Sequence, residues 1–538
     1  MTNEASGTQG PGFDCDVLVA GLGPVGAALA ALLARHGVRT IAIDKDTTVY
    51  PLPRAVHFDH EIMRIFQQLG IAETVLGHAK ETPAYEFRAA DGQLLLRIDP
   101  AAETPSGWAS GYMFHQPGLE LALRDLLAVS PDADMRVGWR FDGLKQDAGG
   151  VTATLVGPGG PSTIRAQYLI GCDGASSPVR EAIGGGLSSY AFDEPWLVID
   201  VKVQPGARLP EVNLQVCDPA RPTTCVLSGP GRHRWEFMLL PGETPEAVLD
   251  EDFIQALLAP WDCGPVEIER RAVYRFHGLV AREWRVGRVL LAGDSAHQTP
   301  PFAGQGMCSG LRDAANLAWK LAAVIQGRAD EVLLDTYQSE REPHARTLIE
   351  LAIGMGRVVC LQDKDAADTR DRQLLDIRKA GASALPPLRP APFANGCILA
   401  GSPGAGDLFP QATCGVGEWR LRLDDAMPDG AWLISRRSVD VLSDGLIVRS
   451  LEDGALAPFR IDLTNWLDQS GAEAVLVRPD RYVFGTGEPV ALAAAWSHAL
   501  RPVRQAARSD QRDPPENAET SPRADRLFAR QPLHPGRG

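Results

Sequence analysis

A glycine-rich turn between a short apolar strand and an Ala/Leu-rich helix constrains this chain more than any other feature. Residues 15–20 form the predicted strand, and residues 21–34 turn into a helix that stops at Gly37. A second apolar strand follows at residues 38–44. Strand, helix and strand within about 30 residues make a βαβ unit, which predicts an α/β domain built on a parallel sheet.

The turn has the pattern GxGxxG, which binds dinucleotides when it joins a strand to a helix. Gly21 permits the tight turn, and Gly23 lets the backbone approach a pyrophosphate at the positive end of the helix. Gly26 lets the helix pack closely on the strand, and Asp44 can accept hydrogen bonds from a ribose diol. The residues expected at this site are Gly21, Gly23, Pro24, Val25, Gly26, Asp44 and Lys45.

A second glycine-containing segment favours FAD over NAD as the bound dinucleotide. The strand at 289–292 ends in Gly293-Asp294, and a Pro/Gly loop at 300–306 leads into a helix at 307–326. Asp294 can bind a polyhydroxyl chain such as ribityl. The start of the helix favours negative charge, which a reduced flavin carries at its N1–C2 edge.

This segment resembles the second FAD fingerprint of the class A flavoprotein aromatic hydroxylases, which include p-hydroxybenzoate and phenol hydroxylases. Asp173, in YLIGCDGASSPVR, resembles a motif of that family linked to both FAD and NAD(P)H. Arg54 resembles the family's loop arginine, and Gln116 resembles a glutamine that touches the flavin. The segments GQGMCSGLRDAANLAWKL, RWEFMLLPGE and AVLVRPDRYVFG are most similar to 3-(3-hydroxyphenyl)propionate hydroxylases, over nearly the whole chain except both tails.

The resemblance implies a set of residues around FAD. They are Gly21, Gly23, Pro24, Val25, Gly26, Asp44, Lys45, Arg54, Gln116, Asp173, Asp294, Pro301, Gly304, Gly306 and Met307. Cys308 departs from the family, in which asparagine is common at this place. A thiol is a weak donor, so any flavin contact there must come mainly from backbone N–H groups. Arg312 and Asp313, further along the same helix, are expected on its surface or at a domain boundary.

The implied fold is α/β with an α+β substrate layer, of the p-hydroxybenzoate hydroxylase type. The expected parts are an FAD-binding part at 14–190 with inserted strands near 86–106, an antiparallel substrate sheet at 191–287, and a second FAD-binding part with helices at 288–383. A Pro/Ala linker is expected at 384–393, a thioredoxin-like domain at 394–503 and a disordered tail at 504–538.

Composition narrows the possible partners and the compartment. The net charge of −15 argues against nucleic acid and against anionic membrane surfaces. The sequence has no apolar run long enough to span a bilayer, no signal peptide and no CxxC among its nine cysteines. We therefore expect a cytoplasmic protein with reduced thiols and no bound metal. The family also suggests a homodimer.

The resemblance implies a monooxygenase in which NADH or NADPH reduces FAD, and O2 then supplies one oxygen atom to a phenolic ring. Because no second GxGxxG exists, the nicotinamide is expected to bind transiently near the flavin. A near-neutral base would help to deprotonate the phenol. His57, Tyr274 and the His233/Arg234 pair are candidates for that base, and Pro301 is expected beside the reacting ring.

The expected substrate is a meta-substituted phenol with a short carboxylated side chain, 3-(3-hydroxyphenyl)propionate or 3-hydroxycinnamate, hydroxylated ortho to its OH. A buried carboxylate needs a charge-assisted donor, and Arg221, Arg234 and Arg275 are the candidates. The alternatives are an aromatic hydroxylase that tailors polyketides or antibiotics, and a non-catalytic flavin-binding protein. A halogenase would carry W-x-W-x-I-P and a Baeyer–Villiger enzyme a second dinucleotide fingerprint; this sequence has neither.

Overall fold

A computed structural model describes residues 12–381, 391–415, 417–441 and 445–501. Most of the linker expected at 384–393 lies outside these residues, and so does the whole tail expected at 504–538. Within the part described, no helix is both long and apolar enough to cross a membrane.

The dinucleotide fingerprint belongs to an eight-stranded sheet whose central strands run parallel, in the order β17-β18-β11-β1-β2-β8. Its strands are β1 (Cys15–Ala20), β2 (Thr40–Asp44), β8 (Ala133–Val137), β9 (Arg140–Gln146), β10 (Val151–Gly157), β11 (Gly160–Gly171), β17 (Arg285–Val286) and β18 (Val289–Leu291). The predicted βαβ unit is confirmed, with its second strand starting at Thr40.

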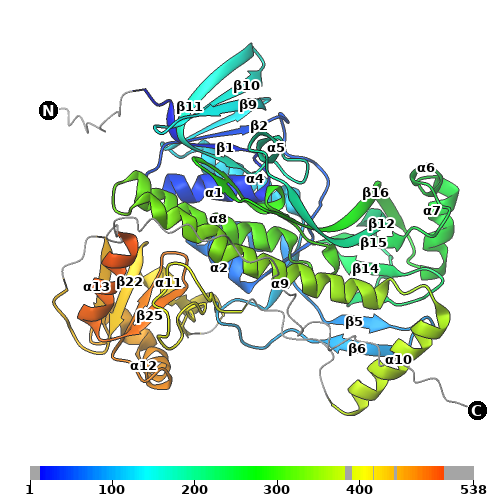
Figure 1. The fold of residues 1–538 in the computed structure, drawn as a ribbon. Helices are drawn as coiled ribbons and strands as arrows, with labels where there is room; N and C mark the ends of the chain where they lie inside the picture. Colours follow the sequence, from blue (N-terminus) through cyan, green and yellow to red (C-terminus); the bar gives the residue numbers. More distant parts are fainter. Residues whose placement is uncertain (1–11, 382–390, 416, 442–444, 502–538) are drawn as a thin grey trace, which may run out of the picture. The chain divides into compact units, whose positions relative to one another are not determined.

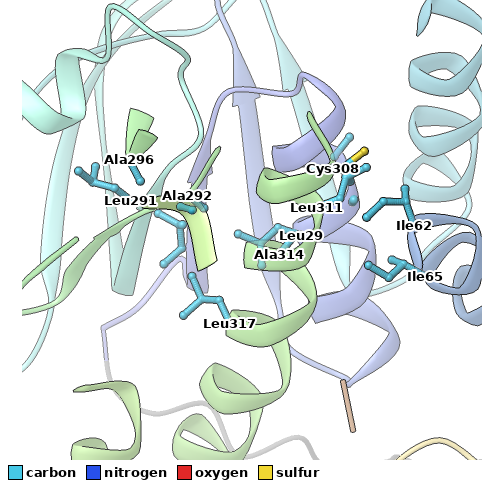
Figure 2. Packing of buried hydrophobic residues seen from close by; sticks show 14 of the residues in the cluster. Leu29, Ile62, Ile65, Leu291, Ala292, Ala296, Cys308, Leu311, Ala314 and Leu317 are labelled. Carbon is cyan, nitrogen blue, oxygen red and sulfur yellow. The ribbon is translucent and has the colours of Figure 1, made fainter. Parts of the chain in front are cut away.

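Helices α1 (Pro24–Arg35) and α8 (Gly306–Ile325) pack against each other beneath this sheet (Figure 1). Figure 2 shows Leu29 of α1 and Leu311 of α8 in one buried apolar layer with Leu291 of β18. The close approach needs a small residue, because a Cβ at Gly310 would overlap Val25 of α1. The two FAD fingerprints, far apart in sequence, are thereby held side by side.

The other helices cover these layers and the sheets described below. They are α2 (His60–Leu69), α3 (Ala72–Leu76), α4 (Gln116–Ala128), α5 (Pro178–Ala182), α6 (Pro245–Val248), α7 (Glu251–Leu258), α9 (Asp335–Val359), α10 (Lys364–Lys379), α11 (Leu423–Ala426), α12 (Arg460–Gln469) and α13 (Pro489–Leu500).

A second eight-stranded sheet has the order β19-β16-β12-β15-β14-β13-β5-β6 and is mainly antiparallel. Its strands are β5 (Tyr85–Arg88), β6 (Leu94–Ile98), β12 (Leu187–Val203), β13 (Asn213–Val216), β14 (Thr223–Leu227), β15 (Arg232–Met238), β16 (Val266–Ala281) and β19 (His297–Gln298). Strand side chains alternate between faces. Trp235 and Phe237 therefore pack with α7 on one face, while Arg234 and Glu236 line a cavity on the other.

Three short strands, β3 (His57–Asp59), β4 (Ala79–Glu81) and β7 (Gly111–Phe114), form a small separate sheet. The C-terminal part contains a four-stranded mixed sheet of β22 (Ala431–Ser435), β23 (Leu446–Ser450), β24 (Ala474–Val477) and β25 (Val483–Gly487), and a two-stranded pair of β20 (Thr413–Cys414) and β21 (Leu421–Arg422). The thioredoxin-like assignment of this part stays a prediction. Cys397 and Cys414, its two cysteines, are both free thiols.

Candidate active site

The site lies at the carboxyl edge of the parallel sheet. Strands β1, β2, β11 and β18 run in the same direction, so the residues that follow them meet at one edge. This edge carries the turn at Gly21, the carboxylate of Asp44, Cys172 and the loop at Asp294. Open α/β sheets bind ligands outside the carboxyl ends of their strands.

The three glycines of the fingerprint are needed for different structural reasons. Gly21 has φ +102°, and a Cβ there would overlap the carbonyl of Cys172. A Cβ at Gly26 would overlap the carbonyl oxygen of Gly21. Around Gly23, in contrast, no atom of the described residues lies within 4 Å of an added Cβ, and Gly23 lines the cavity. Gly21 and Gly26 are thus required by the fold, whereas Gly23 leaves room for a ligand.

Asp44 closes the turn from the neighbouring strand. Its carboxylate accepts a hydrogen bond from the backbone N–H of Leu22 at 2.9 Å and lies 3.5 Å from the guanidinium of Arg124. Lys45 points away, because its ammonium pairs with Asp46 at 2.9 Å and its side chain is 68% exposed. Of the two adjacent residues, only Asp44 therefore contacts the glycine turn.

Gln116, at the start of α4, holds the loop that carries Arg54. Its Oε1 accepts the backbone N–H groups of Arg54 at 3.0 Å and Ala55 at 2.6 Å, and its Nε2 donates to Glu120 at 2.7 Å. The side chain of Arg54 is exposed and lines the cavity. Gln116 also lines the cavity, but its amide is engaged in fixing this loop.

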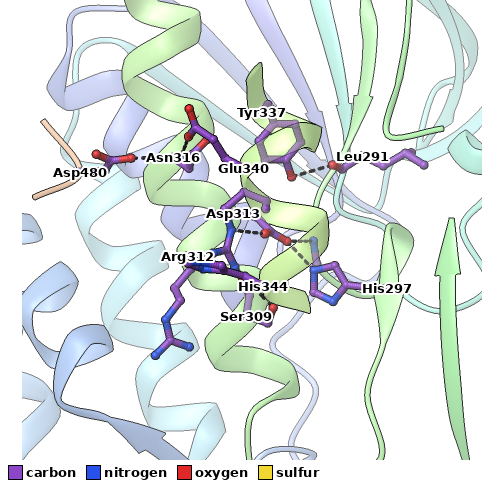
Figure 3. A network of polar contacts seen from close by, with 12 residues as sticks. Leu291, His297, Ser309, Arg312, Asp313, Asn316, Tyr337, Glu340, His344 and Asp480 are labelled. Atoms are coloured by element: carbon purple, nitrogen blue, oxygen red, sulfur yellow. Dashed lines mark hydrogen bonds and ion pairs between the residues drawn. The ribbon is translucent and has the colours of Figure 1, made fainter. Parts of the chain in front are cut away.

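Asp294 lines the cavity just after β18, and burial raises the pKa of its carboxyl group. The turn before it is held by Asp313 of α8, which accepts the backbone N–H of Gly293 at 3.1 Å. Asp313 also contacts His297 at 2.6 Å (Figure 3). Its other oxygen accepts from Arg341 at 2.9 Å. The expected position on the helix surface is therefore wrong for Asp313, which is fully buried in a charged network behind the loop.

Arg312 is buried as well, and it ties α8 to the strand that carries His57. Its guanidinium pairs with Asp59 at 2.5 Å and Glu61 at 2.6 Å. Glu61 in turn accepts the hydroxyl of Tyr482 at 2.7 Å. Arg312 thus links α8 to β3 and α2, and Glu61 links this pair to Tyr482 of the C-terminal part.

The loop before α8 brings Pro301, Gly304, Gly306 and Met307 to the cavity wall. Cys308 turns away, with its buried thiol 3.7 Å from the carbonyl of Gly304.

His57 lines the cavity opposite this loop, with Nδ1 3.3 Å from the Gly304 carbonyl. Burial lowers the pKa of His57, so the ring is neutral at physiological pH and Nδ1 donates to that carbonyl.

The cavity has a volume of about 1450 Å³. Drug-sized ligands occupy pockets of roughly 300–1,000 Å³, so this space can take a dinucleotide and a second small molecule. It runs from Gly23 to the second sheet. The sheet residues that line it include Tyr85, Val198, Gln215, Thr224, Val226, Arg234, Glu236, Arg270, Tyr274 and Phe276.

The three arginines expected to bind a substrate carboxylate lie in different surroundings. Arg221 pairs with Glu243 at 2.6 Å, and Arg275 pairs with Asp193 at 3.1 Å with its side chain 60% exposed. Neither is part of the cavity wall, because each points away from the face that lines it. The expectation is corrected for both, and Arg234 alone of the three reaches the cavity.

Arg234 is already occupied by protein partners. Its Nε donates to Asp200 at 2.7 Å, Nη1 to the Arg54 carbonyl at 2.9 Å and Nη2 to the Pro53 carbonyl at 2.6 Å. Arg270 binds the same Asp200 at 2.6 Å. Arg234 therefore anchors the loop that Gln116 also holds.

Of the remaining expected residues, some line the cavity and others do not. Tyr274 lines the cavity, and its hydroxyl accepts from Arg270 at 3.0 Å. His233 points to the opposite face, where burial lowers its pKa to about 4, so it is not placed to act as the base. The carboxylate of Asp173 accepts from the Ser177 hydroxyl and from the backbone N–H of Val179, at the start of α5.

Sequence reasoning missed Glu236 and Arg270 on the cavity wall. The alternation in RHRWEFM could have found Glu236, because residues two apart on a strand share a face. Arg270 lies next to Arg271 on β16, and nothing local distinguishes it from Arg271, which points outward to Glu251.

Comparisons with known proteins agree with this geometry. The FAD binding domain family matches residues 14–352. A probable NADH-specific resorcinol 4-hydroxylase of Rhodococcus jostii is 38% identical over 511 residues, covering 90% of this chain and 94% of the relative. A 3-(3-hydroxy-phenyl)propionate/3-hydroxycinnamic acid hydroxylase of Mycobacterium avium is 34% identical, covering 89% and 91%.

Among solved structures, aklavinone-11 hydroxylase in complex with FAD and aklavinone has the same fold. It matches with a TM-score of 0.73 and 24% identity, over 91% of this chain and 100% of that one. Fold and site thus define a flavoprotein monooxygenase of the p-hydroxybenzoate hydroxylase type. The chain belongs to the FAD-dependent aromatic hydroxylases.

Proposed function

We propose that this protein hydroxylates a single-ring phenol ortho to its hydroxyl group, with O2 and with NADH or NADPH as the electron source. The observation that carries the proposal is one continuous cavity, which joins the FAD fingerprints to the face of the second sheet. The relatives named for 3-hydroxyphenylpropionate and for resorcinol act on small meta-substituted phenols, which this cavity can hold beside a flavin.

The residues present fit FAD. The open space at Gly23 suits a pyrophosphate at the start of α1. Asp44, at the end of β2, would accept hydrogen bonds from a ribose. The Thr299 hydroxyl lines the cavity and has no hydrogen-bond partner among the described residues, as expected of a group that faces a ligand. In this proposal Arg54 faces the phosphates, Asp294 binds the ribityl chain, and Pro301, Gly304, Gly306 and Met307 border the flavin ring.

FAD, when bound, supplies the chemistry: it accepts a hydride from the nicotinamide and activates O2 for transfer of one oxygen atom. The protein positions the phenol, excludes water and withdraws the phenolic proton. Arg234 and Gln116 fix the loop at residues 53–55, which carries Arg54 on the cavity wall. The aromatic side chains of Phe276 and Phe302 pack edge to face and give the cavity wall an apolar part.

Two substrate classes remain within the proposal. The first is the carboxylated phenol, 3-(3-hydroxyphenyl)propionate or 3-hydroxycinnamate, to which Arg234 and Arg270 would contribute positive charge. The second is a neutral meta-diphenol such as resorcinol. The second is favoured by the engagement of Arg234 with Asp200 and two backbone carbonyls, which leaves it poorly placed to form a new ion pair.

The test measures NADH and NADPH oxidation by the holoenzyme with 3-(3-hydroxyphenyl)propionate, 3-hydroxycinnamate, resorcinol, phenol and a bulky polycyclic phenol. Product and H2O2 are quantified together, because uncoupled turnover releases H2O2. We expect coupled turnover with at least one single-ring phenol. Coupling only with the polycyclic phenol would point to an enzyme that tailors polyketides. FAD binding without coupled turnover on any phenol would overturn the proposal.

We expect Asp294→Ala and Cys308→Ser to differ strongly. Removal of the Asp294 carboxylate leaves ribityl hydroxyls unpaired, which costs about 1–3 kcal/mol of FAD affinity. Cys308 faces the Gly304 carbonyl rather than the cavity, and serine can donate to the same oxygen. Titration of apoprotein with FAD should show weaker binding for Asp294→Ala only. Loss of FAD in Cys308→Ser with normal binding in Asp294→Ala would reverse the assignment.

A further inference from the structure

Glu236 has a buried carboxylate that faces the cavity, and no described residue donates a hydrogen bond to it. The residue is 6% exposed and lies on β15, on the same face as Arg234. Among the described residues its nearest cationic atom is Nη1 of Arg234 at 3.7 Å, beyond hydrogen-bond distance. A buried carboxylate normally accepts several hydrogen bonds, so this one is available to a molecule in the cavity.

The polar neighbours of Glu236 point elsewhere. Thr224, its cross-strand partner on β14, donates its hydroxyl to Gln215 at 2.8 Å, and the Gln215 amide donates to the Tyr85 hydroxyl. On the other side Glu236 is paired in register with the apolar Val198. The polar side chains next to Glu236 across the sheet are therefore hydrogen-bonded to one another. Of the ionisable side chains among these described neighbours, only that of Glu236 has no hydrogen bond.

The charged groups around Glu236 on its own strand and on the neighbouring strands leave one net positive charge. Arg234 on β15 and Arg270 on β16 are positive, whereas Asp200 on β12 is negative and binds both guanidinium groups. Tyr85 on β5 is the remaining titratable neighbour, and burial raises its pKa. Burial also raises the pKa of Glu236, and Arg234 offsets this only in part. A carboxylate whose pKa is raised by burial is a better proton acceptor than an ordinary exposed carboxylate.

We propose that Glu236 accepts the hydrogen bond of the substrate's phenolic hydroxyl and takes its proton, so that the ring reacts as the phenolate. The O–H bond of the phenol breaks, its electron pair stays on the phenolic oxygen, and a new O–H bond forms on the Glu236 carboxylate. This assignment rests on the proposed phenol hydroxylation. His57 is less suited to the same task. Its Nδ1 is hydrogen-bonded to the carbonyl of Gly304, which belongs to the loop before α8 and not to the substrate sheet.

The test compares wild-type holoenzyme with Glu236→Gln on two kinds of phenol. One is the best substrate of the panel, which is un-ionised at neutral pH; the other is a nitro-substituted analogue that is already ionised. We expect Glu236→Gln to lower the rate of product formation about 100-fold or more with the first, the usual contribution of a general base. The loss should be much smaller with the ionised analogue, because its proton is already gone.

Glu267→Gln is the matched control, because Glu267 lies on the same sheet but is 58% exposed and pairs only loosely with Lys202 at 3.5 Å. It should change neither rate. If Glu236→Gln does not fold with FAD, difference infrared spectroscopy of the wild type provides the readout. Phenol binding should then produce a carboxylic-acid C=O band, which Glu236→Asp retains at a shifted frequency.

Equal losses on both phenols would assign Glu236 a merely structural role and overturn the proposal, as would full activity of Glu236→Gln or the absence of the infrared band. These outcomes leave phenol hydroxylation itself intact. A wild-type enzyme that couples with no phenol would instead overturn the proposed function.

Discussion

Gly23→Val should purify as a folded protein that no longer binds FAD. The space around an added Cβ at Gly23 is free of atoms of the described residues, so the apoprotein can hold the larger side chain without strain. Gly23 is also the N-cap of α1 with φ −67°, a conformation open to any residue. The side chain would instead fill the place that the pyrophosphate requires.

Gly26→Val is the informative comparison, because its Cβ would overlap the carbonyl oxygen of Gly21. A backbone atom in a tight turn cannot move aside, so we expect this variant to be destabilised by at least about 1–3 kcal/mol. Thermal unfolding of the apoproteins, together with FAD content by absorbance, separates the two effects. A yellow Gly23→Val protein with normal FAD affinity would contradict the assignment of the pyrophosphate site.

Glu340→Gln should lower the free energy of unfolding by about 3–5 kcal/mol, the usual cost of leaving a buried charge without its partner. Glu340 of α9 is fully buried between Lys320 of α8 at 2.8 Å and Arg478 of the C-terminal part at 2.7 Å. Its second oxygen accepts the backbone N–H of Cys397 at 2.7 Å. Figure 3 places Glu340 beside Asn316, which donates to it at 2.7 Å.

Chemical denaturation measures the expected loss. Asp262→Asn serves as control, since the Arg208–Asp262 pair is 71% and 82% exposed and should contribute little. An unchanged unfolding midpoint in Glu340→Gln would show that this network does not stabilise the fold.

The pH dependence of stability gives a second readout of the same network. Burial alone would raise the pKa of Glu340, but Arg478 and Lys320 outweigh it and hold the pKa well below its ordinary value. A depressed folded-state pKa gives stability that is fully present above the unfolded value of about 4.3 and is lost as the pH falls below it. Glu340→Gln should therefore lose less stability than the wild type on acidification below about pH 4.

The fingerprints could be predicted from sequence because their physical causes are local. Gly21 and Gly26 are dictated by a turn within six residues, and Asp44 by the end of the next strand. The end of a strand at Asp294 could likewise be read from the sequence, and the parallel pairing of β18 with β11 brings it to the same edge. Chemistry that depends on one turn or one strand end leaves a pattern in the sequence.

The substrate side could not be predicted in the same way. Arg221, Arg234 and Arg275 are equally plausible in the sequence, and only the packing of the sheet decides that Arg234 alone faces the cavity. Alternation along β15 divides its residues into two faces but does not say which face is covered by α7. The burial of Asp313 depends on Arg341, a residue of another helix.

Four backbone polar groups of the loop at residues 53–55 have hydrogen-bond partners within the protein. Gln116 accepts the N–H groups of Arg54 and Ala55, and Arg234 binds the carbonyls of Pro53 and Arg54. Cofactor binding therefore does not have to order this segment, which would cost conformational entropy. Such preorganisation raises the affinity without any additional contact. Protein from which FAD has been removed should accordingly keep the conformation of this loop, and addition of FAD should reconstitute the holoenzyme.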